Sequence, residues 1–216
     1  MEQFANRSVA GQALAAALSE KGYEDPVVLA LPRGGVPVAI EIVRALKAPL
    51  DLIMVRKIGV PSQPELAAAA IVNGDDPQIV INTEIARAFN LTQERISQLA
   101  EQQLLEIQRR RRAYLGDRKS VPIQGRTAIV VDDGIATGAT VRASLKALKR
   151  RGPARIVLAV PVAARDSLAQ LRGDVDDIVC LQMPEPFWAI GAHYVDFTQT
   201  PDSEVIRLLA EADSLA

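Results

Sequence analysis

The stretch of sequence that decides the fold is Ala128-Ile129-Val130-Val131-Asp132-Asp133-Gly134-Ile135-Ala136-Thr137-Gly138-Ala139-Thr140. It begins as an apolar run, passes through two adjacent carboxylates, and ends in a turn of small and hydroxyl-bearing residues. The apolar run is typical of a buried parallel strand, and the helical spacing of Val141, Leu145 and Leu148 predicts a helix directly after the turn. The sequence therefore predicts a strand that leads into a helix through this turn.

The turn has the composition of an anion site. Backbone N–H groups at the start of a helix lack partners, and the helix dipole favours negative charge there. Gly138 and Ala139 carry no bulky side chain, so a phosphate can approach these donors closely. The hydroxyls of Thr137 and Thr140 add further hydrogen bonds. The two carboxylates would repel a phosphate, so their expected partners are the vicinal hydroxyls of a ribose or a divalent cation; an Asp pair that caps an ordinary helix is the alternative.

This stretch resembles the motif that binds phosphoribosyl pyrophosphate in type I phosphoribosyltransferases, and it matches at every diagnostic position. The resemblance implies that Asp132 and Asp133 hold the ribose hydroxyls. It also implies Mg²⁺ as cofactor, which the two carboxylates would hold indirectly, through those hydroxyls or through water. The residues that it assigns to the 5-phosphate are Ala136, Thr137, Gly138, Ala139 and Thr140.

A second strand-to-helix turn lies upstream, where the apolar run 27–31 is followed by Pro32-Arg33-Gly34-Gly35. Two glycines free the backbone, and Arg33 places a guanidinium beside them. The segment resembles the family's pyrophosphate loop, in which a peptide that is often cis and non-proline turns its N–H groups toward the leaving group. The resemblance assigns Arg33, Gly34 and Gly35 to pyrophosphate binding, whereas an ordinary turn is the alternative.

A third segment is a strand at 52–55 that opens into Arg56 and Lys57 and then into a Gly/Pro-bearing loop over 59–64. The spacing resembles the adenine-type enzymes of the family. It implies that Arg56 and Lys57 are catalytic, stabilising the departing pyrophosphate, and that the mobile loop closes as a lid to exclude water. The alternative is a solvated rim at a strand end.

The composition predicts one α/β domain over residues 1–216. Of the 216 residues 49% are hydrophobic, and the formal net charge is −1, so no excess of basic charge points to nucleic acid. The sequence carries neither a secretory pattern nor an apolar run long enough for a membrane, and the expected location is the cytoplasm.

Apolar runs alternate with helical patterns along the chain, which predicts a mostly parallel sheet with helices on both faces and a site at the carboxyl ends of its strands. The expected strands lie near residues 27–31, 50–55, 67–73, 127–131, 155–160 and 176–182.

A helical insertion over about 83–118 interrupts this alternation. A capping box at Thr92 starts a long helix that runs to about Leu115 and ends in the basic run Arg109–Arg112. The arginines are interpreted as a solvated face, although an anionic partner is the alternative. The apolar stripe of this helix suggests a subunit contact, as in the dimers common in the family, so a homodimer is expected.

Aromatic residues gather in the segment of about 183–200. This segment resembles the hood of hypoxanthine-guanine phosphoribosyltransferases, which implies that Trp188 stacks on the acceptor, that Phe187 supports it, and that Asp196 is the acidic residue of the hood. A small satellite core that contains Phe187, Trp188 and Tyr194 is the alternative.

Two departures leave the acceptor open. Ala136 stands where hypoxanthine-guanine enzymes carry an Asp that is proposed to handle a proton, and in this it resembles the adenine and orotate enzymes. The spacing from Gly191 to Asp196 differs from the hood pattern by one residue. The nearest overall resemblance is to stand-alone bacterial phosphoribosyltransferases of unassigned acceptor. The role of the single histidine, His193, stays open between structure and catalysis.

The function that the resemblance implies is transfer of the 5-phosphoribosyl group from phosphoribosyl pyrophosphate to a nitrogen acceptor, a nucleobase, with release of pyrophosphate. One alternative is a regulator that senses phosphoribosyl pyrophosphate without catalysis. Another is a hydrolase or phosphorylase that acts on ribose phosphates in the same pocket.

Overall fold

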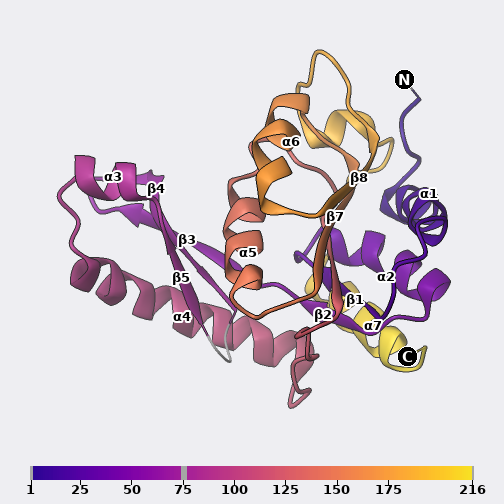
Figure 1. Cartoon of the computed structure of the whole chain (residues 1–216), viewed down its shortest axis with the longest axis horizontal. Coiled ribbons are helices and arrows are strands. Elements are labelled where there is room, and N and C mark those ends of the chain that lie inside the picture. Colours follow the sequence, from indigo (N-terminus) through magenta and orange to yellow (C-terminus); the bar gives the residue numbers. More distant parts are fainter. Residues whose placement is uncertain (1, 74–76, 216) are drawn as a thin grey trace.

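Five parallel strands form the central sheet in the order β2-β1-β6-β7-β8 (Figure 1). The computed structural model describes residues 2–73 and 77–215. The five strands are β1 (Pro26–Ala30), β2 (Leu50–Leu52), β6 (Thr127–Val131), β7 (Arg155–Val162) and β8 (Asp177–Gln182). In the middle of the sheet, Ala30 of β1 lies opposite Leu52 of β2 and Val131 of β6. The predicted parallel α/β sheet is confirmed.

Helices cover both faces of this sheet. They are α1 (Arg7–Ser19), α2 (Gly35–Leu46), α5 (Ala139–Lys149), α6 (Arg165–Leu171) and α7 (Asp202–Asp213). Two short 3-10 helices, η1 (Arg172–Asp174) and η2 (Ile190–His193), follow α6 and β8. Val28 and Ile129 pack with α1, α2 and α7 on one face, whereas Val27 and Val130 pack with α5 and α6 on the other. Because alternate residues of a strand point to opposite faces, strands buried on both faces are apolar throughout.

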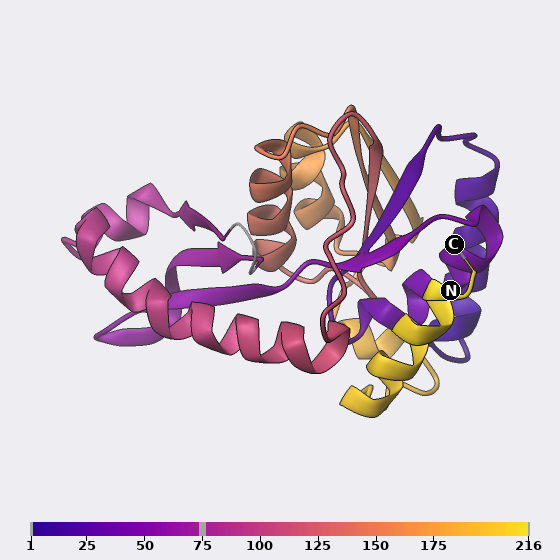
Figure 2. The same cartoon turned by 90° about the horizontal axis from the view of Figure 1, so that it is seen from below.

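A second, antiparallel sheet forms an arm that extends to one side of the core in both views (Figures 1 and 2). Its strands are β3 (Val55–Val60), β4 (Gln63–Val72) and β5 (Gln78–Ile81), and its helices are α3 (Thr83–Ala88) and α4 (Gln93–Leu115). The predicted cap of α4 is confirmed, since the Thr92 side chain accepts a hydrogen bond of 3.2 Å from the Arg95 backbone N–H. The insertion is therefore two helices that close a small sheet.

The arm corrects two expectations. The strand expected at 67–73 in the parallel sheet belongs instead to β4, which pairs antiparallel with β3 and β5. The segment 59–64, expected as a mobile loop, consists of two strand ends joined by Pro61 and Ser62 alone. A two-residue connection can join only antiparallel neighbours, so the hairpin turn decides the direction of β4.

The long helix α4 packs within its own chain. Ile96, Ala100 and Ile107 are buried in the core on the side of α1, α2 and α7, so the apolar stripe that suggested a subunit contact is already covered. Among the helices of the described residues, none has the length and apolar character that crossing a membrane requires.

The basic end of α4 is only partly a solvated face. Arg109 and Arg110 pair with Glu106 one turn earlier on the exposed side of the helix. Arg111, however, is buried, and its Nη1 lies 3.9 Å from Oδ1 of the buried Asp51 in β2. The expectation of a uniformly solvated run is wrong at this position because the end of α4 meets the edge of the parallel sheet.

Candidate functional site

The two glycine-bearing turns meet at the carboxyl ends of β1 and β6, which are neighbours in the sheet. The backbone N–H of Leu31 donates to the Val131 carbonyl over 2.9 Å, which brings the end of β1 beside the acidic pair. A Cβ on Gly35 would lie 2.7 Å from the Val131 carbonyl oxygen, and a Cβ on Gly34 would overlap the Asp133 carboxylate. Only glycines at these positions allow the two turns to approach so closely.

The peptide between Pro32 and Arg33 is cis, a form that the family resemblance led us to expect in this turn. The Arg33 side chain lies across the turn toward the start of α7, where its Nη1 is 3.3 Å from Oδ1 of Asp202. The Tyr114 hydroxyl donates to the same oxygen over 2.7 Å. Arg33 therefore pairs with Asp202, a partner that the sequence analysis did not predict.

The acidic pair has a cationic partner that sequence reasoning missed. Arg7, at the start of α1, donates from Nε to Oδ2 of Asp133 over 2.8 Å, and both side chains are nearly buried. The Arg7 guanidinium lies 3.9 Å from the centroid of the Phe197 ring and donates to the Thr198 carbonyl over 2.8 Å. Arg7 therefore joins α1, the hood segment and the acidic pair.

Burial sets the electrostatics of the pair. It raises the pKa of Asp132 well above the ordinary value, and the neighbouring charge of Asp133 raises it further. Burial also raises the pKa of Asp133, although the hydrogen bond from Arg7 opposes this shift. Oδ1 of Asp132 accepts a hydrogen bond of 2.9 Å from the Asp133 backbone N–H, which fixes the orientation of the Asp132 carboxylate.

The turn before α5 leads directly from β6 into the helix. Gly138 adopts φ 71°, which favours glycine, and α5 begins at the next residue. The back of the turn is fixed, because the Ile135 backbone N–H donates to Val162 over 3.0 Å and the Ser167 hydroxyl donates to the Ala136 carbonyl. Its front, including Thr137, is exposed. A ligand can therefore reach the free N–H groups at the start of α5.

The structure separates Arg56 from Lys57. Both lie in β3, so they point to opposite faces of the arm sheet. Arg56 faces α4, where its Nη2 is 3.8 Å from Oε1 of Glu106, while Lys57 faces α5 and lines a cavity beside Thr140. Only Lys57 is thus on the side of the phosphate turn.

The hood segment closes over the far side of the acidic pair. The Tyr194 hydroxyl donates to the Asp133 carbonyl over 2.6 Å, and Phe187 stacks on His193 with ring centroids 5.5 Å apart. Phe187 and Tyr194 belong to a small apolar cluster, as the satellite-core alternative predicted, but Trp188 is 82% exposed and lies outside it. The carboxylate of Asp196 accepts hydrogen bonds from Thr198 within the hood.

Replacement of Arg7 by Gln is expected to destabilise the fold by about 3 kcal/mol, or roughly 6–12 °C in Tm, because it leaves the nearly buried Asp133 carboxylate without its cation. The interaction exists only while Asp133 is ionised. The Tm difference from the parent should therefore shrink as the pH falls through the raised pKa of Asp133. Thermal unfolding at a series of pH values measures this.

The matched control is Arg207→Gln, which removes exposed ion pairs with Glu204 and Glu211 on α7 and should leave Tm nearly unchanged, because solvent screens exposed pairs. Equal effects of the two substitutions, or a pH-independent effect at Arg7, would contradict the role of the buried pair.

Comparison with known proteins identifies the family. The model of the phosphoribosyl transferase domain matches residues 3–197. Two provisionally named phosphoribosyl transferases of Mycobacterium tuberculosis, from strains CDC 1551 and H37Rv, are each 44% identical over 212 residues, which is 98% of this chain and 47% of theirs. The chain thus spans about half the length of these curated relatives. The crystal structure of TT1426 from Thermus thermophilus is 39% identical and superposes with a TM-score of 0.86, covering 98% of this chain and 99% of that one. On the domain match and these identities, the chain belongs to the phosphoribosyl transferase domain family.

Proposed function

We propose that the protein transfers the 5-phosphoribosyl group from phosphoribosyl pyrophosphate to a nitrogen acceptor, a nucleobase, and releases pyrophosphate. The observation that carries the proposal is the close approach of Gly34 to Asp133 beside the exposed turn that precedes α5. This approach brings a ribose-type acidic pair, an anion-binding turn and a second glycine turn to one edge of the sheet.

The donor would bind along this edge. Asp132 and Asp133 would accept hydrogen bonds from the two ribose hydroxyls, and the hydrogen bond from Arg7 would favour the ionised form of Asp133. The 5-phosphate would sit on the N–H groups that begin at Gly138, with the hydroxyls of Thr137 and Thr140 as further donors.

The pyrophosphate would lie against the Gly34 and Gly35 turn. Arg33 and Arg56 would exchange their present carboxylate partners for the leaving group, whereas Lys57 has no hydrogen bond or ion pair within residues 2–73 and 77–215. Donors of this kind contribute most when negative charge builds on the departing oxygen, and each well-placed one is worth about 3 kcal/mol.

The acidic pair fits Mg²⁺ only in part. Two adjacent carboxylates offer the oxygen ligands that this ion prefers, yet across the described residues no third His, Cys, Asp or Glu joins them in a cluster. Asp132 and Asp133 would therefore hold the ion through ribose hydroxyls or water. When bound, Mg²⁺ supplies neutralisation of the pyrophosphate charge.

In the reaction the bond from C1 of the ribose to the pyrophosphate oxygen breaks, and a bond from C1 to the acceptor nitrogen forms with inversion. The transition state has oxocarbenium character. The acceptor nitrogen would release its proton to water, because Ala136 offers no acid or base at the position where hypoxanthine-guanine enzymes carry an Asp. The protein would act mainly by positioning the reactants and by neutralising charge.

The proposal is tested by incubating the protein with phosphoribosyl pyrophosphate, Mg²⁺ and a pool of nucleobases and amines, followed by product analysis. A new nucleotide together with pyrophosphate is the expected result. Free ribose 5-phosphate would instead indicate a hydrolase, and tight donor binding without turnover would indicate a sensor.

Trp188→Leu is expected to raise the KM for the acceptor about tenfold while leaving Tm and donor affinity unchanged. The exposed indole makes few packing contacts, whereas loss of a stacked base costs about 1–3 kcal/mol. Steady-state kinetics and thermal unfolding measure the two effects. Phe187→Leu is the comparison, because Phe187 lies in the apolar cluster and its truncation should lower Tm. Unaltered acceptor kinetics in Trp188→Leu would remove the argument for stacking.

A further inference from the structure

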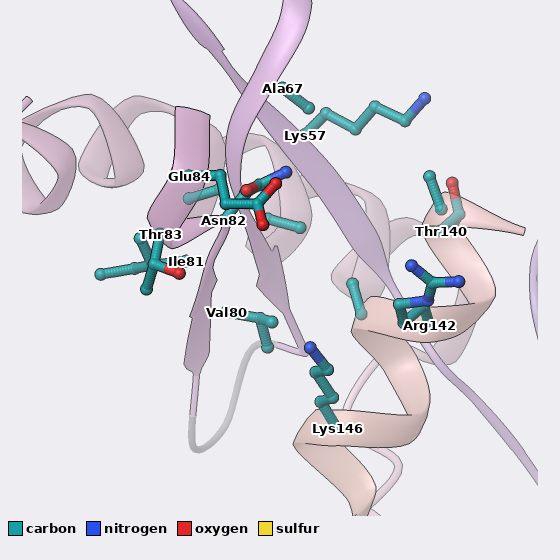
Figure 3. A pocket seen from close by; sticks show the side chains of 14 residues that line it. Lys57, Ala67, Val80, Ile81, Asn82, Thr83, Glu84, Thr140, Arg142 and Lys146 are labelled. Carbon is teal, nitrogen blue, oxygen red and sulfur yellow. The ribbon is translucent and has the colours of Figure 1, made fainter. Parts of the chain in front are cut away.

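A cavity of about 380 Å³ lies between α5 and the arm sheet, beside the phosphate turn (Figure 3). One wall is a row across three strands, in which Lys57 of β3 lies opposite Ala70 of β4 and Ala70 lies opposite Val80 of β5. The other wall is α5, which presents Ala143 one turn after the phosphate turn. Small side chains on both walls leave this space unfilled and open to solvent.

Cations dominate the polar lining of this cavity. Arg142 and Lys146 extend from α5 and Lys57 extends from β3, whereas Glu84 supplies the one carboxylate of the lining. Within the described part of the chain, neither lysine has a hydrogen bond or an ion pair. Arg142 donates from Nη2 to Gln170 over 2.8 Å, but its Nε is buried and has no partner there. The positive charge around the cavity is therefore largely uncompensated, which favours an anionic occupant.

We propose that this cavity binds a small molecule through a phosphomonoester dianion. Two negative charges match the excess of positive charge in the lining, and the volume lies within the range of small-molecule sites, about 300–1,000 Å³. The small and apolar side chains of the arm sheet would cover the body of the ligand. Asn82 and Thr83 lie on the same side and offer hydrogen bonds to it.

The site adjoins the phosphate turn without duplicating it. The turn offers backbone N–H groups at the start of α5, whereas the cavity offers side chains that follow one and two turns later on the same helix, Arg142 and Lys146. Lys57 and Thr140 lie where the two meet. The proposal needs no transferase activity, so it can fail or succeed independently of the proposed function.

Calorimetric titration with AMP, ribose 5-phosphate and uncharged adenosine tests the site. AMP and ribose 5-phosphate are expected to bind, whereas adenosine is expected not to. Lys146→Gln should weaken the binding of both phosphates about tenfold, because it removes one charged contact to the phosphate. Stronger binding of AMP than of ribose 5-phosphate would assign the ligand as a nucleotide, and the reverse would assign it as a sugar phosphate. The matched control is Lys149→Gln, since Lys149 lies on the same helix but points to Asp174 outside the cavity.

The same titration in an Asp132→Asn, Asp133→Asn background separates the cavity from the ribose contacts of the donor site, and dependence on Lys146 separates it from the phosphate turn. Binding that depends on Lys146 should persist there, because the cavity contains neither carboxylate. Equal affinities of the Lys146→Gln and Lys149→Gln variants would overturn the proposal. So would adenosine binding as tight as that of AMP, or loss of the Lys146-dependent binding together with the two carboxylates.

Discussion

The Asp132→Asn, Asp133→Asn variant is expected to lose at least about a hundredfold in kcat with phosphoribosyl pyrophosphate as donor and to bind the Mg²⁺-donor complex far more weakly. Carboxylates accept strongly from both ribose hydroxyls, whereas amides are neutral and weaker acceptors. The Asn side chain at position 132 can still accept the backbone N–H of residue 133, whereas the ion pair between Arg7 and residue 133 is lost, so the variant should fold with a lower Tm. Calorimetry with the donor and a turnover assay measure the two effects.

The matched control is Asp166→Asn, which removes an exposed carboxylate from the first turn of α6. It should leave donor binding and turnover unchanged. If the folded double variant binds the donor as tightly as the control does, the role proposed for Asp132 and Asp133 is wrong.

The single variant Asp132→Asn should be more stable than the parent at neutral pH. The pKa of Asp132 is raised in the folded state, so the parent loses free energy of unfolding as the pH rises from the unfolded value near 4 through the raised pKa. Asn does not titrate. The Tm advantage of the variant should therefore be small near pH 4 and grow across that window. Such a result would show that the buried charge of Asp132 lowers the stability of the fold at the proposed donor site.

The local parts of the site could be predicted from the sequence. The turns at Pro32–Gly35 and Asp132–Thr140 each follow an apolar strand and precede a helical pattern, so a few adjacent residues determine their conformation. The two turns lie close together because both follow parallel strands, whose carboxyl ends share one edge of the sheet, where ligands bind. Neither step needs information about distant residues.

The partners of the charged groups could not be predicted in the same way. Arg7 lies 126 residues before Asp133, and Asp202 lies 169 residues after Arg33, and nothing in a single sequence marks such pairs. The prediction for the strands of the arm was wrong for a related reason. The run of alanines and branched residues over 67–72 indicates a strand but not its neighbours, and the short turn at Pro61 and Ser62 decided the pairing.

Gly34→Ala is expected to reduce kcat/KM about a hundredfold and to lower Tm, although it adds only one methyl group. An ideal Cβ at residue 34 overlaps the Asp133 carboxylate, which Arg7 holds from the other side over 2.8 Å. The carboxylate must move, and its ion pair with Arg7 breaks, which costs about 3–5 kcal/mol for a buried pair. Gly173→Ala is the control, because a Cβ there meets no atom within 4 Å.

A second substitution distinguishes a clash with Asp133 from a general intolerance of the turn. Asp133→Ala removes the atoms that the new methyl group meets, so the Gly34→Ala, Asp133→Ala variant should unfold at nearly the same temperature as Asp133→Ala alone. Turnover should not return, since the carboxylate itself is missing. Additive losses of stability in the double variant would show that the methyl group at position 34 disturbs the turn itself, and the close approach of the two turns would then lose its place in the proposed mechanism.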